Sequence, residues 1–180
     1  CWLFFDESTT KMQFVDELYW ISQTNNNFTV GIDGISLFFL LLSTLLIPIC
    51  LLASWNIKVF LKEYVMTFLF LEILLILVFS VSDVFLFYIF FESVLIPMYI
   101  IIGIWGSRQR KIRAAYLFFL YTLFGSLVML LAIAYIYSVV GSTDYETLMC
   151  FHFSDLEQKI LWVAFFFSFA SKIPMIPVHL

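Results

Sequence analysis

Long apolar stretches separated by short polar segments make up most of this chain. A membrane-spanning helix needs about 20 consecutive, mostly apolar residues. Five stretches fit this length, at residues 34–53, 64–81, 84–104, 114–140 and 160–180. Uninterrupted apolar runs of this length are typical of helices, because strands are usually much shorter. The pattern therefore predicts an all-α membrane protein with five transmembrane helices, in which residues 34–180 form the transmembrane domain.

The segment before the first apolar stretch has a different pattern. Residues 13–21 and 28–32 alternate in the manner of strands, and residues 22–27 between them are rich in turn-forming side chains. We therefore expect residues 1–33 to lie outside the membrane and to form a small hairpin. An interfacial amphipathic helix over residues 11–21 is the alternative.

Two short sequence features predict how the helices pack. Only Ser82 and Asp83 separate the second and third stretches, and Asp83 suits the N-cap of the helix that follows. These two helices are therefore expected to be antiparallel neighbours. In the fourth stretch, Gly125 and Ser126 have small side chains that allow another helix to approach closely.

Composition excludes several classes of protein. Hydrophobic residues make up 63% of the 180 positions, charged residues only 12%, and the formal net charge is -4. Soluble domains contain roughly 25% charged residues, disordered chains have low hydrophobicity, and nucleic-acid-binding surfaces need a basic excess. The three cysteines, Cys1, Cys50 and Cys150, are far apart and form no CxxC pair. We therefore expect no metal or cluster site in this chain.

The distribution of basic residues predicts the orientation of the helices. The loops at residues 54–63 and 105–113 carry six cations, whereas the opposite side carries only Lys11 and Lys159. The positive-inside bias places the two basic loops in the cytoplasm or its organellar equivalent and the N-terminal segment outside. The basic run at residues 108–113 is interpreted as a topology signal, with an anionic-lipid site as the alternative.

Three ionisable residues lie within the apolar stretches, namely Glu72, Glu92 and Lys172. A charge near the bilayer centre costs about 2.5–3.5 kcal/mol, so such residues usually face a protein interior or a water-filled cavity and often have a function. Counted from the outer ends of their helices, Glu92 lies at a depth of ~12 Å and Lys172 at ~18 Å. The difference of ~6 Å allows the two side chains to share one polar pocket near the midplane.

Three prolines stand close to these charges, namely Pro97, Pro174 and Pro177. Proline has no N–H, so each one leaves the carbonyl four residues earlier without its helical donor. Free carbonyls at membrane depth are tolerated only inside protein or beside a water-filled cavity. We therefore predict that Lys172 lies at the break of a discontinuous helix, as the midplane sites of many ion-coupled transporters do.

Other interpretations of the same residues stay open at this point. Glu92 and Lys172 are also compatible with a static buried pair that specifies packing. Glu72 suits either a hydrogen-bonded contact between helices or part of an ion route. His179 is either a proton relay or the polar end of the broken helix.

Several motifs together resemble one family. They are Gly-Ile-Asp-Gly-Ile-Ser-Leu at residues 31–37, Phe-Phe-Glu-Ser-Val-Leu-Ile-Pro-Met at 90–98, Ile-Trp-Gly at 104–106, Ser-Arg-Gln-Arg-Lys at 107–111, Phe-Leu-Tyr-Thr-Leu-Phe-Gly-Ser at 119–126 and Lys-Ile-Pro-Met-Ile-Pro-Val-His at 172–179. On these motifs the chain resembles the family of subunit 4 of NADH dehydrogenase, the proton-pumping respiratory complex I. The run from residue 101 to residue 113 is especially similar to the mitochondrially encoded form.

The resemblance implies an antiporter-like fold of fourteen helices, of which this chain resembles helices three to seven. It also implies that Glu92 and Lys172 form the charged pair of a proton channel, with the lysine in a broken helix. The expected function is proton translocation, as a subunit of an NADH:ubiquinone oxidoreductase of the mitochondrial respiratory electron-transport chain. The expected location is the inner membrane, with the basic loops in the matrix and the N-terminal segment in the intermembrane space.

The same resemblance implies where the redox chemistry lies. FMN, iron-sulfur clusters and ubiquinone belong to other parts of the complex, and we expect no cofactor site in this chain. The expected partners are other membrane-arm subunits, the chains that supply the missing helices, and lipids, but no nucleic acid.

The chain departs from the family in extent. The first two helices and the second half of the family's sequence are absent, so we expect either one product of a split gene or a partial chain. Two further interpretations remain, a subunit of a multi-subunit cation/proton antiporter and a structural assembly fragment of complex I.

Overall fold

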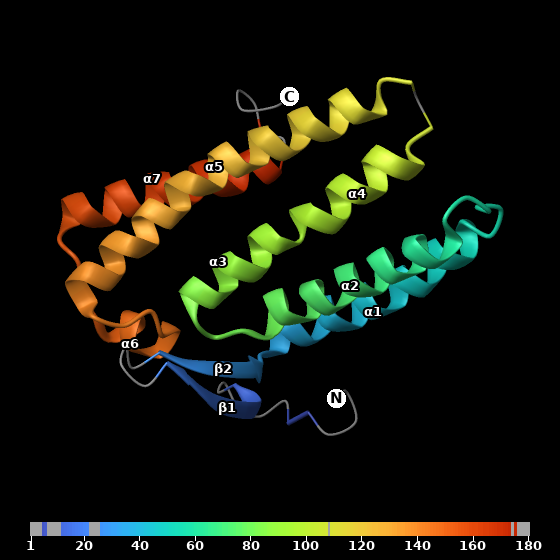
Figure 1. Cartoon of the computed structure of the whole chain (residues 1–180). Coiled ribbons are helices and arrows are strands. Elements are labelled where there is room, and N and C mark those ends of the chain that lie inside the picture. The colour runs from blue at the N-terminus through green and yellow to red at the C-terminus, as the bar shows by residue number, and fades with distance from the viewer. Residues whose placement is uncertain (1–4, 7–11, 22–25, 108, 174, 176–180) are drawn as a thin grey trace.

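The chain begins with a two-stranded hairpin at one end of a layer of long helices (Figure 1). The computed structural model describes residues 5–6, 12–21, 26–107, 109–173 and 175. Strand β1 (Gln13–Ile21) pairs antiparallel with β2 (Asn26–Ile32), with Glu17 opposite Thr29. The predicted hairpin is therefore confirmed, and the alternative of a helix over residues 11–21 is wrong.

The first two helices, α1 (Gly34–Ala53) and α2 (Leu61–Ser80), lie side by side (Figure 1). Helix α1 begins at Gly34 because the Asp33 carboxylate accepts a hydrogen bond of 2.7 Å from the Gly34 N–H and caps the first turn. Phe39 of α1 stacks on Phe79 of α2 with 5.2 Å between ring centroids. The two helices thus pack through aromatic side chains near the start of α1.

The third apolar stretch forms two helices in line rather than one. Helix α3 (Val84–Ser93) begins at Asp83, which caps it as predicted, and α4 (Leu95–Trp105) continues after an interruption at Val94. Pro97 has no N–H to offer the Ser93 carbonyl, so one helical hydrogen bond is missing at this point. The interruption therefore falls two residues after Glu92 and directly after Ser93.

Three helices complete the described chain. They are α5 (Lys111–Val140), the short α6 (Tyr145–Cys150), which the sequence pattern does not predict, and α7 (Asp155–Lys172). Helix α7 begins five residues before the expected span 160–180 and ends at Lys172. The structure describes the expected broken helix only up to the end of its first half at Lys172. The residues expected after the break, Pro174, Pro177 and His179, lie outside the described residues.

Four spans in the described part of the chain are long and apolar enough to cross a membrane: α1, α2, α3 together with α4, and α5. Helix α7, the expected fifth span, is not among them, because Asp155, Glu157, Lys159 and Lys172 all lie within its 18 residues. Most of these charges lie in its first turns, which extend before the expected apolar span.

The two basic loops lie at the same end of the helical layer. Trp105 at the end of α4 donates a hydrogen bond of 2.8 Å from its ring N–H to the carbonyl of Val59 in the α1–α2 loop. The hairpin lies at the opposite end, where the Ser82 N–H donates to the Thr29 carbonyl at 3.1 Å. The basic loops and the hairpin therefore lie at opposite ends of the helices, which the predicted orientation in the membrane requires.

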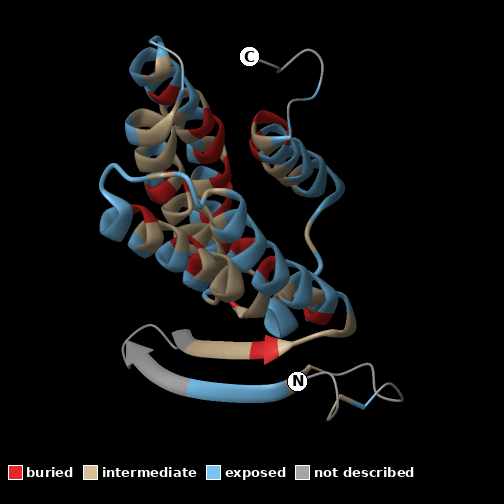
Figure 2. Ribbon diagram, turned by 90° about the vertical axis from the view of Figure 1, so that its right-hand side faces the viewer, coloured by how far each residue is buried: buried red, intermediate tan, exposed pale blue. Residues whose placement is uncertain are grey.

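Buried positions are concentrated where helices touch, and α5 holds the most of them (Figure 2). Met129 and Ser126 of α5 are fully buried, whereas Phe124 and Leu131 on the same helix are 67% and 71% exposed. A helix with a small-residue buried face and a large apolar exposed face is typical of membrane bundles. Its exposed face suits lipid or neighbouring apolar protein.

Candidate functional site

The last turn of α3 and the last residue of α7 bring two opposite charges together. The ammonium nitrogen of Lys172 lies 3.1 Å from Oε1 of Glu92, and the two side chains are only 16% and 14% exposed. The residues are 80 positions apart in sequence, so the pairing depends on how α3 and α7 pack. The structure thus places the two charges that the sequence singled out in one largely buried ion pair.

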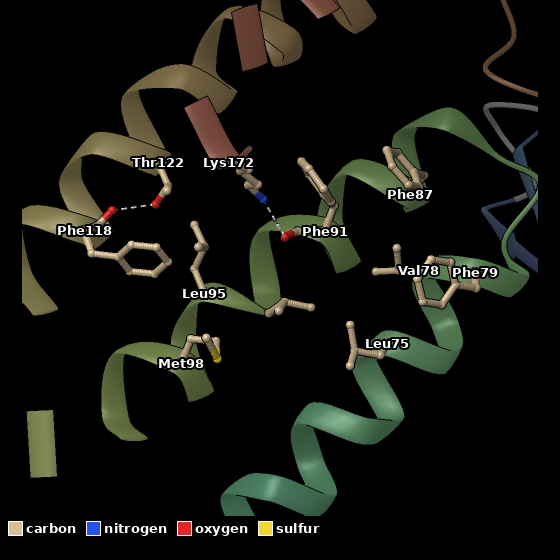
Figure 3. Close-up of a pocket in the computed structure, with 11 residues that line it drawn as sticks. Leu75, Val78, Phe79, Phe87, Phe91, Leu95, Met98, Phe118, Thr122 and Lys172 are labelled. Atoms are coloured by element: carbon tan, nitrogen blue, oxygen red, sulfur yellow. Dashed lines mark hydrogen bonds between the residues drawn. The ribbon is translucent and has the colours of Figure 1, made fainter. Parts of the chain in front are cut away.

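The Lys172 ammonium has two further contacts, both with Phe91. It donates a hydrogen bond of 2.9 Å to the Phe91 carbonyl and lies 3.2 Å from the centroid of the Phe91 ring (Figure 3). The ring packs in turn against Phe87 of α3 and Phe169 of α7. A carbonyl, an aromatic face and a carboxylate therefore share one cation.

The end of α7 at Lys172 has a local cause in the sequence. Ile173 has extended backbone angles of φ -93° and ψ 104°, and it precedes Pro174. A residue before proline is disfavoured in the helical region, since the proline ring collides with it. The helix therefore stops where the lysine can extend toward α3.

Helix α7 is held in position by close contact with α5. A Cβ atom placed on Gly125 of α5 would lie 2.2 Å from Oγ of Ser171. Ser168, Ala170 and Ser171 are all buried on this side of α7. The predicted close approach at Gly125 and Ser126 is confirmed, and it fixes the helix turn that carries Lys172.

Glu92 is poorly partnered apart from the ion pair. Both its carboxylate oxygens are buried and accept no hydrogen bond within the described part of the chain, because the ammonium is directed mainly at Phe91. Tyr88 lies one helical turn before Glu92 on the same helix. The site therefore includes a tyrosine that sequence reasoning missed, although its spacing of four residues from Glu92 was a usable signal.

A cavity of about 340 Å³ lies beside the lysine, between α2, α3, α4, α5 and α7 (Figure 3). Its lining is Leu75, Val78, Phe79, Phe87, Phe91, Val94, Leu95, Met98, Phe118, Thr122 and Lys172. The Thr122 hydroxyl is engaged with the Phe118 and Phe119 carbonyls, at 2.8 and 3.1 Å. Lys172 is therefore the only charged group facing this otherwise apolar space within the described residues.

The remaining predicted residues lie in different places. Glu72 is half-buried on α2, and no hydrogen bond or ion pair joins it to Glu92 or Lys172 among the described residues. Pro97 is buried at the start of α4. Pro174, Pro177 and His179 lie outside the described residues. The Phe91 ring was missed as well, and in a chain with 23 phenylalanines no sequence signal distinguishes it.

Two family models match adjacent parts of the chain. Residues 81–180, which contain Glu92 and Lys172, match the model described as NADH:quinone oxidoreductase/Mrp antiporter, TM. Residues 7–82 match the model described as NADH-ubiquinone oxidoreductase chain 4, amino terminus. One match ends and the other begins at the turn between α2 and α3.

Curated relatives are similar over nearly the whole chain. NADH-ubiquinone oxidoreductase chain 4 of Arabidopsis thaliana is 59% identical, and the match covers 99% of this chain and 36% of the relative. The protein of the same name from Metridium senile is 49% identical, over 99% of this chain and 38% of the relative. The chain thus spans slightly more than a third of the length of these relatives.

A solved structure has the same arrangement of helices. The structure titled respiratory complex I from Thermus thermophilus with bound NADH contains a chain that matches with a TM-score of 0.79 and 26% sequence identity. The match covers 93% of this chain and 35% of the other. The similarity therefore extends over nearly the whole chain.

Proposed function

The chain belongs to the NADH:quinone oxidoreductase/Mrp antiporter transmembrane family, and we propose that it is part of the proton-translocating chain 4 of an NADH:ubiquinone oxidoreductase. The family and its apolar helices make it a multipass inner-membrane protein. We place it in the mitochondrial inner membrane, with the basic α1–α2 and α4–α5 loops in the matrix and the hairpin on the intermembrane side. The positive-inside bias supports this orientation.

The observation that carries the proposal is the largely buried ion pair of Glu92 and Lys172. A buried ammonium keeps its proton more readily beside a carboxylate than alone, because the paired charge offsets the cost of leaving water. Separating the two side chains removes that compensation, and the lysine then releases its proton. A movement between α3 and α7 therefore controls a proton at one nitrogen atom.

The driving reaction lies elsewhere in the proposed complex. We infer that FMN, iron-sulfur clusters and ubiquinone are held by other subunits, and that quinone reduction there alters the electrostatic potential at this pair. The partners of the chain are then other membrane-arm subunits, the segments that complete its own antiporter-like fold, and lipids. Its contribution to the enzyme is proton translocation rather than electron transfer.

The test is Glu92→Gln in the intact complex, built with the full-length subunit. The substitution keeps the size of the side chain but removes its charge, so we expect a lower ratio of protons pumped to electrons transferred. Glu63→Gln is the matched control, since Glu63 is an exposed glutamate in the first turn of α2. Normal pumping by a fully assembled Glu92→Gln complex would refute the proposal.

A second candidate is a subunit of a multi-subunit cation/proton antiporter, because the matching family model includes such antiporters. The two candidates differ in their partners, so isolation of the native complex in mild detergent separates them. Co-purification with flavin and iron-sulfur subunits supports the oxidoreductase and excludes the antiporter.

A further inference from the structure

The Phe91 carbonyl is available to a side chain because the helix is interrupted just after it. Across the interruption, the Val94 N–H donates to the Phe90 carbonyl at 3.2 Å, and the Met98 N–H donates to the Val94 carbonyl at 3.4 Å. Within the described residues, no backbone N–H donates to the Phe91 carbonyl, which accepts from the Lys172 ammonium at 2.9 Å instead. The lysine therefore replaces a helical donor that the interruption removes.

The Phe91 ring contacts the same ammonium through its face. The Lys172 nitrogen lies 3.2 Å from the ring centroid (Figure 3). The ring is held in place by Phe87, with 5.3 Å between centroids, and by Phe169, which meets it edge-on at 5.7 Å. Because the Lys172 side chain is only 16% exposed, little water competes with the ring, and a cation is attracted most strongly to an aromatic face in such surroundings.

Phe91 and Glu92 differ in what else they border. Phe91 lines the cavity of about 340 Å³ beside Lys172, whereas Glu92 is not among the described residues that line it. The ammonium forms a hydrogen bond with the Phe91 carbonyl, whereas its contact of 3.1 Å with Oε1 of Glu92 is not aligned as a hydrogen bond. An ammonium that leaves the carboxylate for the cavity can therefore keep its contacts with Phe91.

We propose that Phe91 is a positioning residue that holds the protonated Lys172 ammonium, by its ring face and its carbonyl, when the ammonium separates from Glu92. This inference rests on the proposed proton-translocating function. The proton stays on the lysine nitrogen during this step, and only the partners of the ammonium change. Phe91 lowers the free energy of the separated, still protonated state, so the lysine reaches the cavity before it releases its proton.

The rank order of two variants in the intact complex tests the ring. Phe91→Leu removes the aromatic face but keeps an apolar side chain and the backbone carbonyl, whereas Phe91→Tyr keeps the aromatic face and adds a hydroxyl. We expect the pumping rate per assembled complex to fall roughly tenfold in Phe91→Leu, the scale of a desolvated cation–π contact, and at most about twofold in Phe91→Tyr. A side chain that only fills apolar space predicts the opposite order, because tyrosine brings a polar group into the cavity and leucine does not.

Phe90→Leu is the matched control for the loss of a ring. Phe90 is the preceding residue of α3 and is half-buried, as Phe91 is. Its ring packs edge-on against Phe28 of β2, with 6.2 Å between centroids. We expect Phe90→Leu to pump at the normal rate. A loss as large as that of Phe91→Leu would show that the effect is one of packing and would overturn the inference.

A stability measurement keeps the proposal testable where Phe91→Leu assembles poorly. The substitution is made in the wild-type complex and in a complex that carries both Glu92→Gln and Lys172→Met, in which the ring has no cation to hold. We expect Phe91→Leu to lower the amount and the thermal denaturation temperature of assembled complex more in the wild-type background, because only there does it remove a cation contact. Equal losses in the two backgrounds would assign the ring to packing alone and overturn the inference.

Failure of this inference is distinct from failure of the proposed function. A normal pumping rate in Phe91→Leu, or a rate in Phe91→Tyr no higher than in Phe91→Leu, would overturn the role of the ring. Either result leaves the proposed function intact as long as Glu92→Gln still lowers the proton-to-electron ratio. Normal pumping in Glu92→Gln would instead refute the proposed function itself.

Discussion

Gly125 of α5 lies so close to Ser171 of α7 that a Cβ atom on the glycine would stand 2.2 Å from the serine Oγ and 2.6 Å from its Cβ. Ser171 directly precedes Lys172, and its hydroxyl donates to the Ser168 carbonyl at 2.7 Å. The absence of a side chain at Gly125 therefore sets the distance between α5 and the turn of α7 that carries the lysine.

Gly125→Ala is expected to push these two helices apart. Overpacking of a close contact typically costs about 1–3 kcal/mol, and here the shift falls next to the ion pair. We expect a lower thermal denaturation temperature of the purified complex, together with reduced pumping per assembled complex.

Gly103→Ala provides the control for this substitution. Gly103 lies in α4, and no atom outside its own helix lies within 4 Å of a Cβ atom built there. Alanine favours the helix by up to about 1 kcal/mol relative to glycine, so we expect unchanged or slightly raised stability. Equal losses in both variants would contradict the role of the close contact at Gly125.

Asp83 joins two parts of the fold at the hairpin end. Its Oδ1 accepts from the Phe85 and Leu86 N–H groups at 2.8 and 3.0 Å, and its Oδ2 accepts from the Thr143 hydroxyl at 2.7 Å. The residue is only 3% exposed. It therefore caps α3 and ties the start of that helix to the segment after α5.

Asp83→Ala is expected to cost about 2–3 kcal/mol, because it removes an N-cap and leaves the Thr143 hydroxyl without its acceptor. Asp83→Asn keeps the capping oxygen and is expected to cost about 1 kcal/mol. The comparison is made by thermal denaturation of the assembled complex. Equal destabilisation by the two variants would show that capping contributes little.

The helical arrangement could be predicted largely from apolar length and from local signals such as Asp83 and Gly125. The interruption at Val94 was missed as an element boundary, although Pro97 pointed to a missing hydrogen bond there. The short α6 was missed because its six residues, Tyr145–Cys150, are too few to show a helical period. Local sequence therefore predicts the long helices better than it predicts the points at which a helix is interrupted.

The site was predictable only in part. Helix rise placed Glu92 and Lys172 within ~6 Å in depth, but depth says nothing about whether two helices are neighbours. The contacts of Lys172 with Phe91 depend on how α3 and α7 pack. Such long-range packing is not encoded in the period of any single helix. The expected polar surroundings also differ from the largely apolar cavity beside Lys172.

Glu157 is expected to control the start of α7. It accepts from the Ser154 N–H at 2.9 Å and the Ser154 hydroxyl at 2.7 Å, and it accepts from the Tyr135 hydroxyl of α5 at 2.6 Å. Glu157→Ala removes this capping box, so we expect faster hydrogen exchange in the first turn of α7. Glu146→Ala, at an exposed glutamate in α6, is the control and should leave exchange in α7 unchanged.

Lys172→Met distinguishes a working ion pair from a static one. The variant leaves the Glu92 carboxylate buried without a cation, which is expected to cost about 3 kcal/mol and to lower the amount of assembled complex. Adding Glu92→Gln removes the stranded charge, so the double variant should recover much of the assembly. A static pair predicts that the recovered complex also pumps, since two neutral side chains fill the same space. The proposed function predicts that it assembles and fails to pump. The decisive measurement is therefore the proton-to-electron ratio per assembled complex in the double variant, and a normal ratio would contradict the assignment of these two residues to the proton route.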